Sequence, residues 1–341
     1  MTDGAERGLV LGVDSGGSGL RIALARAADG RVLETTASAE PVRTGAGGID
    51  AGHLLAQLLP AVASLTARAE GADPGGDSGG TDPGGAGRIV AVAVGAAGMA
   101  TLGDGLRAEL PGAFARAWGV RRLALAADAV TAYAGALGQR PGAVVAGGTG
   151  LIAMGTDLTG WRRADGWGHL LGDCGSGAWI GRAGLEAAMR AHDGRRGGSA
   201  ALLACAEDLF GPVAGLPGAL YPRSDRPAVL ASFAPRVSAC AAAGDPVAAD
   251  VLARAARHIA EAAEAVCPPE ADVEVALTGG LFKMGEPLLG PLRAELGGLL
   301  PRAREVPAAG DPLAGAVTIA AALADGTLRL PEDPRLLQLT R

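Results

Sequence analysis

The residues best suited to chemistry are acids and glycines that follow short apolar runs. The clearest case is Asp14, which ends the run LVLGVD and is followed by Ser15, Gly16, Gly17, Ser18 and Gly19. Asp14 could hold a hydrated Mg²⁺ while backbone N–H groups of this turn donate to phosphate oxygens. An ordinary hairpin turn, in which Asp14 accepts from a nearby backbone N–H, is the alternative interpretation. Because residues 20–26 continue as a strand, the turn is not a dinucleotide-binding fingerprint.

Three more glycine turns follow apolar segments further along the chain. They are GGTG (Gly147, Gly148, Thr149 and Gly150), GDCGSG (residues 172–177) and TGG (Thr278, Gly279 and Gly280). One such turn is weak evidence, because the chain of 341 residues contains 56 glycines. Several turns at strand ends are more informative. Open α/β sheets bind ligands outside the carboxyl ends of their strands, where glycine lets the backbone approach phosphate oxygens closely.

Asp128 follows the apolar run LALAA and precedes a segment with helical periodicity. As the N-cap of that helix, it would accept hydrogen bonds from the first backbone N–H groups. As a general base, it would take a proton from a hydroxyl that attacks a phosphoryl group. The sequence leaves both roles open.

The segment from Trp161 to Trp179 contains three of the four tryptophans, together with His169, Asp173 and Cys174. Tryptophan rings stack on sugar faces, and an aspartate can accept two sugar hydroxyls. The alternative is that these rings are core aromatics. With no second histidine near it in the sequence, His169 is expected to be structural, and Cys174 is expected to be a small buried hydrophobe.

Composition excludes several classes of function. The 30 basic and 36 acidic residues are mixed along the chain, which argues against nucleic acid as a partner. The single lysine, Lys283, argues against P-loop and Schiff-base chemistry, and the chain contains no asparagine. The cysteines form no Cys-x-x-Cys pair, and neither a signal peptide nor a membrane-spanning run is visible. These observations predict a protein of the reducing cytoplasm.

Alternating apolar runs and helical segments must position these residues. Residues 9–38 predict three strands joined by tight turns, and residues 51–70 predict a helix. Residues 71–87, rich in Gly, Asp, Pro and Ser, predict a flexible loop. Strands and helices then alternate to the end of the chain, which indicates an α/β protein with two sheets. The expected domains are 1–140 and 141–325, and residues 326–341 could join the first.

Five segments occur in the order found in a known family. They are VDSGGSGLRIAL, LAADAVTAYAGAL, GGTGLIAMG, DGWGHLLGDCGSGAWIGRAGLEAAMRAHDG and ALTGGLFKMGEPLL. Over residues 8–326 the chain resembles N-acetylglucosamine kinases and the wider BadF/BadG/BcrA/BcrD-type ATPases of the actin and sugar-kinase superfamily. The resemblance implies an α/β fold of two ribonuclease-H-like domains with a central cleft that closes on ATP and a sugar.

The resemblance also implies a role for each motif. Asp14 would hold Mg²⁺, and Ser15, Gly16, Gly17, Ser18 and Gly19 would form the first phosphate motif. Gly147, Gly148, Thr149 and Gly150 would form the second phosphate motif, and Thr278, Gly279, Gly280 and Leu281 the adenosine motif. Asp128 would be the general base that activates the sugar 6-hydroxyl. Gly166, Trp167 and Asp173 would line the amino-sugar pocket.

Compared with the family that it resembles, the chain differs from the common pattern at three positions. Cys174 replaces a common glutamate, Leu151 replaces a common serine, and Thr44 lies where an asparagine often meets the sugar. The predicted function is ATP-dependent phosphorylation of an amino sugar, N-acetylglucosamine or a related N-acetylhexosamine, at the 6-hydroxyl. An ATPase activator with an iron–sulfur cluster and a regulator without turnover are the alternatives. The oligomeric state stays open, a homodimer included.

Overall fold

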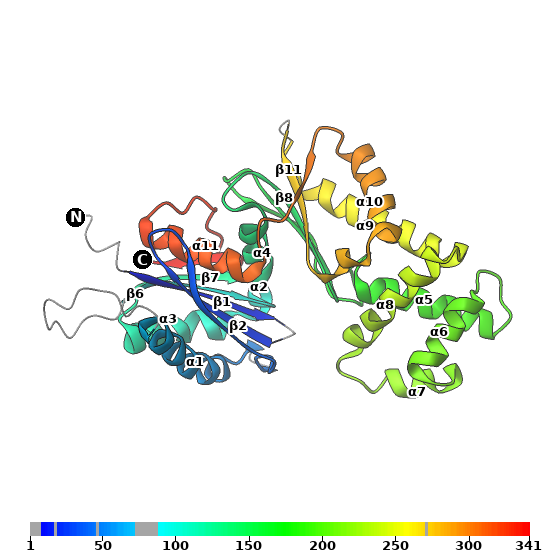
Figure 1. Ribbon diagram of the computed structural model, residues 1–341, viewed down its shortest axis with the longest axis horizontal. Coiled ribbons are helices and arrows are strands. Elements are labelled where there is room, and N and C mark those ends of the chain that lie inside the picture. Colours follow the sequence, from blue (N-terminus) through cyan, green and yellow to red (C-terminus); the bar gives the residue numbers. More distant parts are fainter. Residues whose placement is uncertain (1–7, 17–18, 46–47, 72–87, 270–271) are drawn as a thin grey trace, which may run out of the picture. The chain divides into compact units, whose positions relative to one another are not determined.

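The computed structural model describes residues 8–16, 19–45, 48–71, 88–269 and 272–341, and it divides the chain into two units (Figure 1). Unit 1 comprises Met1–Arg140, Asp157–Trp161 and Ala308–Arg341, and unit 2 comprises Pro141–Thr156 and Arg162–Pro307. Residues 308–325, expected in the second domain, belong instead to unit 1. All but the first residue of the predicted loop 71–87 lies outside the described residues.

Unit 1 is built on a six-stranded sheet. Its strands are β1 (Leu9–Gly16), β2 (Gly19–Arg26), β3 (Val32–Ser38), β6 (Ile89–Ala96), β7 (Arg122–Ala127) and β13 (Leu337–Thr340), in the order β13-β7-β6-β1-β2-β3. Strands β1, β6 and β7 are parallel to one another, whereas β2, β3 and β13 each pair antiparallel with a neighbour. The three strands predicted over residues 9–38 are therefore present, and the turn between the second and third contains Gly30 with a φ of +68°.

Helices cover both faces of this sheet (Figure 1). They are α1 (Ala51–Gly71), α2 (Met99–Leu102), α3 (Asp104–Trp118), α4 (Asp128–Leu137) and α11 (Pro312–Asp325), with a small ribbon of β4 (Thr44–Gly45) and β5 (Gly48–Ile49). Helices α4 and α11 pack together unusually closely. A Cβ atom at Gly135 would lie 2.1 Å from the oxygen of Asp311, and one at Gly315 would lie 1.9 Å from the oxygen of Thr131. This close packing explains why α11 belongs to unit 1.

Unit 2 repeats the strand order of unit 1. Its strands are β8 (Gly142–Gly147), β9 (Leu151–Thr156), β10 (Trp161–Asp165), β11 (Glu274–Thr278) and β12 (Arg304–Pro307), in the order β10-β9-β8-β11-β12. In both units the first strand pairs antiparallel with the second and parallel with the fourth. The repeat agrees with the predicted pair of related α/β domains.

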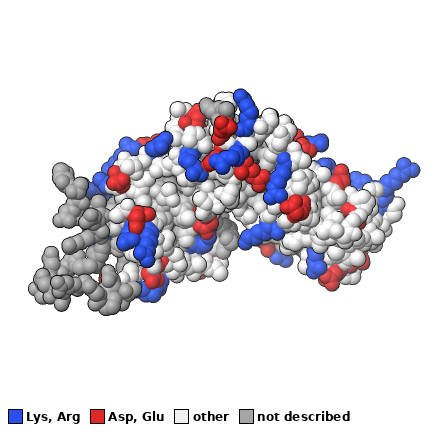
Figure 2. Space-filling model, turned by 45° about the horizontal axis from the view of Figure 1, so that its top comes forward, with Lys and Arg blue, Asp and Glu red and all other residues white. Residues whose placement is uncertain are grey.

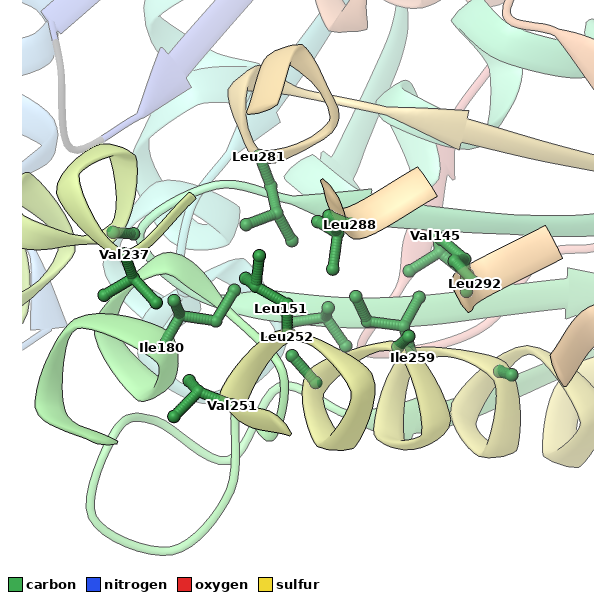
Figure 3. Packing of buried hydrophobic residues seen from close by; sticks show 14 of the residues in the cluster. Val145, Leu151, Ile180, Val237, Val251, Leu252, Ile259, Leu281, Leu288 and Leu292 are labelled. Carbon is green, nitrogen blue, oxygen red and sulfur yellow. The ribbon is translucent and has the colours of Figure 1, made fainter. Parts of the chain in front are cut away.

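The helices of unit 2 include a large group inserted between β10 and β11. They are α5 (Gly177–His192), α6 (Ala200–Phe210), η1 (Val213–Gly215), α7 (Leu216–Leu220), α8 (Arg226–Ala242), α9 (Pro246–Val266), η2 (Gly280–Met284) and α10 (Glu286–Leu299). Helix α9 begins where Asp245 accepts from the N–H groups of Val247 and Ala248, and its buried face packs against β8 and β9. Figure 3 shows Leu252 and Ile259 of α9 in the core of this unit.

The surface carries both signs of charge. On the face shown in Figure 2, acidic and basic side chains are interspersed, as the mixed sequence suggested. Among the described helices, no single one is long and apolar enough to cross a membrane. The bent pair Ala200–Phe210 and Val213–Leu220 reaches that threshold only when both helices are counted together, by length and composition.

Candidate functional site

Asp14 lies near the carboxyl end of β1, directly opposite Arg21 on β2. One carboxylate oxygen, Oδ2, accepts hydrogen bonds from Arg21 Nε at 3.0 Å and Nη2 at 2.6 Å. Arg21 also donates to Asp311, the N-cap of α11. Arg21 therefore ties β1, β2 and α11 together and fixes the orientation of the Asp14 carboxylate.

Burial dominates the electrostatics of Asp14, which is only 9% exposed. Burial raises the pKa of Asp14 above its ordinary value, although the hydrogen bond and charge of Arg21 oppose the shift. Among the described residues, no group donates to the second oxygen, Oδ1, and no backbone N–H donates to either oxygen. A single carboxylate with one open oxygen suits Mg²⁺, which keeps several waters and is often bound through one or two carboxylates plus phosphates.

Strand register places Asp14 and Asp128 at one edge of the sheet in unit 1. Asp14 on β1 lies beside Gly95 on β6, and Gly95 lies beside Ala126 on β7. Asp128 follows two residues after Ala126, so the two acids are separated by about two strand spacings, or about 10 Å. The carboxyl ends of parallel strands are where open α/β sheets bind their ligands.

Asp128 is the first residue of α4, and the N-cap is Ala127, which makes no side-chain cap. Asp128 therefore lies one residue past the N-cap position, although its side chain accepts a backbone N–H of the first turn. Asp128 Oδ1 accepts from the N–H of the next residue, Ala129, at 2.9 Å, and Thr131 donates its hydroxyl to the Asp128 backbone oxygen. The side chain is half-buried. Its role as a base stays a prediction.

The remaining candidates of unit 1 lie on turns. Gly16 and Gly19 end β1 and begin β2, whereas Gly17 and Ser18 between them lie outside the described residues. Ser15 is buried, and its backbone oxygen accepts from the N–H of Ala97. Thr44 is exposed on β4 and lines a hollow of about 360 Å³ beside Glu109 of α3.

The second glycine turn, residues 147–150, joins β8 to β9 in unit 2. The N–H groups of Gly177 and Ala178, at the start of α5, donate to the oxygens of Gly148 and Thr149 at 2.9 and 3.1 Å. The first turn of α5 is thus already hydrogen-bonded. Within the described residues, the N–H groups of Thr149 and Gly150 have no acceptor, so they are the free donors for a phosphate.

The third motif, residues 278–281, contacts this turn directly. Thr278 pairs with Ala146 across β11 and β8, and a Cβ atom at Gly279 would lie 2.2 Å from the oxygen of Gly147. Gly279 also has a φ of +103°, which favours glycine. Leu281 points into the hydrophobic core that also holds Leu151 (Figure 3). Only the backbone of Leu281 is therefore available to a nucleotide.

Asp165 organises the segment that was expected to bind the sugar, and the sequence reasoning missed it. Its carboxylate accepts the N–H groups of Asp173 at 2.5 Å and Cys174 at 2.8 Å. These bonds hold Asp173 in a left-handed conformation with a φ of +53°. A Cβ atom at Gly150 would lie 2.7 Å from Asp173 Oδ2, so this segment adjoins the second glycine turn. The only local signal was an acid before Gly166.

Trp167 is exposed rather than part of the core. It is 65% exposed, and the Arg163 guanidinium lies 4.6 Å from the centre of its ring. Arg163 also donates to the backbone oxygens of Asp165 and Gly166. The alternative of a core aromatic therefore does not hold for Trp167, whose ring is held by a cation and remains accessible to a sugar.

Burial raises the pKa of Asp173, and the charge of Asp165 adds to the shift, although the N–H of Gly168 opposes it. Burial also raises the pKa of the Cys174 thiol, which Asp165 reinforces, so the thiol is neutral near pH 7. Cys174 is half-buried rather than buried. His169, expected to be a satisfied structural residue, makes no hydrogen bond within the described part of the chain.

Comparisons with known proteins agree with this geometry. The model of the BadF/BadG/BcrA/BcrD ATPase family matches residues 11–318. A putative N-acetylglucosamine kinase structure from Chromobacterium violaceum is 29% identical, covering 93% of this chain and 98% of that one, with a TM-score of 0.65. A ROK family glucokinase structure from Streptomyces griseus, in complex with glucose and AMPPNP, is 22% identical with a TM-score of 0.53, covering 93% and 98%.

A shorter match concerns the N-acetylmuramic acid/N-acetylglucosamine kinase of Clostridium acetobutylicum. The two chains are 44% identical over 69 residues, which is 20% of this chain and 22% of that kinase. Together, these findings confirm the predicted actin-like α/β fold and support a sugar-kinase type of phosphotransferase that uses ATP.

Proposed function

Since the chain belongs to the BadF/BadG/BcrA/BcrD ATPase family, we propose that it transfers the γ-phosphoryl group of ATP to the 6-hydroxyl of an amino sugar. N-acetylglucosamine or a related N-acetylhexosamine is the acceptor that the named relatives favour. The observation that carries the proposal is the strand register, which gives Asp14 and Asp128 one edge of the sheet in unit 1.

The phosphates are bound without a lysine at a P-loop. Backbone N–H groups of the turns at residues 15–19 and 147–150 donate to phosphate oxygens, and the free amides of Thr149 and Gly150 support this role. The backbone of residues 278–281 contacts the adenosine. Mg²⁺, held through water or directly by the open oxygen of Asp14, would neutralise charge on the phosphates.

Asp128 acts as the general base. The 6-oxygen of the sugar attacks the γ-phosphorus, the bond from that phosphorus to the β-phosphate oxygen breaks, and the hydroxyl proton passes to Asp128. The products are ADP and the sugar 6-phosphate. The half-buried position of Asp128 at the start of α4, beyond the carboxyl end of β7, supports this assignment.

The sugar is bound by Trp167, Asp173 and the backbone of Gly166, with Thr44 contributing a hydroxyl. The exposed ring of Trp167 offers a stacking face, and the Asp173 carboxylate, which accepts from the N–H of Gly168 at 3.2 Å and from that of Leu151, has acceptor capacity left for a sugar hydroxyl. Cys174 supplies a neutral thiol where a carboxylate is common, so the pocket lacks one charged acceptor.

Burial of Leu151 weakens the alternative of a regulator without turnover. Leu151 is 2% exposed and packs in the core of unit 2, so a leucine there serves packing and removes no ligand from the turn. The remaining departure, Cys174, affects the sugar end of the site rather than the phosphates.

The test is ADP release with a panel of N-acetylhexosamines, amino sugars and plain hexoses, comparing the wild type with Asp128→Asn. We expect ADP release that depends on an N-acetylhexosamine, reduced by about 10²- to 10⁴-fold in the variant. Asparagine can still accept from the N–H of Ala129, so the fold should persist.

Asp104→Asn is the matched control, because Asp104 also opens a helix of unit 1 but its side chain is 97% exposed. Its activity should equal that of the wild type. Equal activity in Asp128→Asn would remove Asp128 as the base. No stimulation by any sugar would favour the regulator, and a brown protein with visible absorbance would favour the iron–sulfur activator.

A further inference from the structure

An apolar groove of about 530 Å³ lies wholly within unit 2, outside the proposed sugar and phosphate contacts. It runs between α5, α7 and the start of α8, and the loop residues His169 and Leu170 border one side. Its volume falls within the range of pockets that hold small molecules. The proposed function gives this groove no role.

The groove has an apolar floor and an exposed apolar rim. Leu185 and Leu216 are 5% and 6% exposed and form the floor. Leu170 and Tyr221, at the rim, are 77% and 75% exposed. Large apolar side chains gathered at an exposed rim typically mark a binding surface, because their contact with water is unfavourable and a bound partner would cover them.

One face of α5 runs along the groove. Arg182, Leu185, Glu186 and Met189 follow the spacing of a single helical face and all line it. From Arg182 to Met189 the face is about 10 Å long. Arg182 lies at the first end of this face, and the apolar Leu185 and Met189 follow it with Glu186 between them, so a cation precedes the apolar residues along the groove.

The charges of the groove favour an anion. Arg182 makes no hydrogen bond or ion pair with any described residue. Arg226 donates only to the backbone oxygen of Tyr221, at 3.0 Å. The acid of the groove, Glu186, is already paired with Arg190, which donates to it at 3.0 and 3.2 Å. Two guanidinium groups are therefore left to attract a carboxylate.

We propose that this groove binds an amphipathic monocarboxylate, with its carboxylate on Arg182 and Arg226 and its alkyl chain along Leu185, Met189 and Leu216. The polar head and the apolar chain then follow the order of residues on α5. His169, half-buried and without a hydrogen bond in the described residues, borders the same groove and can donate to the carboxylate. No bond is formed or broken, so the site is a binding site.

The test uses three probes with the same chain and different heads: octanoate, 1-octanol and octylammonium. Binding to the full chain is measured by ligand-observed NMR and calorimetry below micelle-forming concentrations. We expect octanoate to bind about fivefold more tightly than 1-octanol, as an exposed ion pair would provide, and octylammonium to bind most weakly. Arg182→Gln should reduce octanoate affinity to that of 1-octanol and leave 1-octanol unchanged.

Tyr221→Glu places a competing carboxylate at the rim and should abolish binding of octanoate. Leu209→Glu is the matched control, since Leu209 is a 39%-exposed leucine of α6 that does not line the groove. Equal affinity for all three heads, or unchanged octanoate binding in Arg182→Gln or Tyr221→Glu, would overturn the proposal. A third result would also overturn the proposal: the protein does not bind octanoate, forms a dimer, and loses that dimer in Tyr221→Glu. A second copy of the chain would then be the occupant of the groove.

Discussion

Replacing Asp165 by asparagine tests how the sugar segment is held. The Asp165 carboxylate accepts two backbone N–H groups, from Asp173 at 2.5 Å and from Cys174 at 2.8 Å. Asparagine keeps one acceptor oxygen, and its NH₂ group then faces the other N–H. The variant therefore loses one hydrogen bond to a charged group and leaves one donor without an acceptor.

A hydrogen bond to a charged group contributes about 1.5–3 kcal/mol, and Asp165 is only half-buried, so the lower end applies. The strained φ of Asp173 adds to the loss of stability, because the hydrogen bonds from the Asp173 and Cys174 N–H groups to Asp165 also hold that left-handed conformation. We expect Asp165→Asn to reduce the free energy of unfolding by about 2–3 kcal/mol, which lowers Tm by roughly 4–12 °C. The KM for the sugar should rise more than kcat falls, since Asp173 shifts and Asp128 does not.

Calorimetric unfolding and steady-state kinetics measure the two effects. Asp157→Asn is the control, because Asp157 also accepts a backbone N–H and a hydroxyl, but both come from Thr159 in the same turn and hold no other segment. A Tm of Asp165→Asn within 1 °C, roughly, of the control would refute the reasoning about these two hydrogen bonds.

Three further predictions follow from packing, charge and thiol geometry. Gly279→Ala, which combines a φ of +103° with a backbone clash at 2.2 Å, should lose at least about 2 kcal/mol of stability by denaturant unfolding, whereas Gly280→Ala, with open space around it, should be near neutral. Burial alone would raise the pKa of Asp311, but hydrogen bonds from the first turn of α11 and from a neighbouring arginine lower it. The stability that Asp311 provides over Asp311→Ala, about 1 kcal/mol at neutral pH, should therefore disappear as the pH falls below about 4 in acid titrations; a constant difference would contradict this. The Cys205 and Cys240 sulfurs lie 3.7 Å apart, so diamide should join them in a disulfide detectable by mass spectrometry. Burial and the adjacent thiol raise the pKa of Cys240 to about 11, so the reaction should be faster at pH 9 than at pH 7, and loss of two hydrogens at neither pH would contradict the geometry.

Local sequence signals predicted the individual strands and helices better than they predicted which of the two units each one joins. The hairpin turn at Asp29 and Gly30 is visible in the sequence, and β2 and β3 form as expected. The position of α11 was not predictable, because it depends on close packing across the chain. A Cβ atom at Gly12 of β1 would lie 2.7 Å from Val317 of α11, a contact between residues about three hundred positions apart.

The candidate site residues likewise divide into those that local sequence signals indicate and those that depend on tertiary contacts. Strand ends and glycine turns indicated Asp14, Asp128 and the turn at residues 147–150, because those residues follow apolar runs. Asp165 escaped detection, since its partners are backbone N–H groups eight and nine residues later and no side-chain motif marks such bonds. The structural role of Leu151 was equally hidden, because only tertiary packing distinguishes a core leucine from a lost serine.

We propose that the chain phosphorylates the 6-hydroxyl of an N-acetylhexosamine with ATP. ³¹P NMR of a reaction with N-acetylglucosamine tests it most directly. The account predicts ADP and a phosphomonoester whose phosphorus couples to the two protons on carbon 6, with no product in Asp128→Asn. Inorganic phosphate as the only new phosphorus species, or coupling to a proton on another carbon, would contradict it.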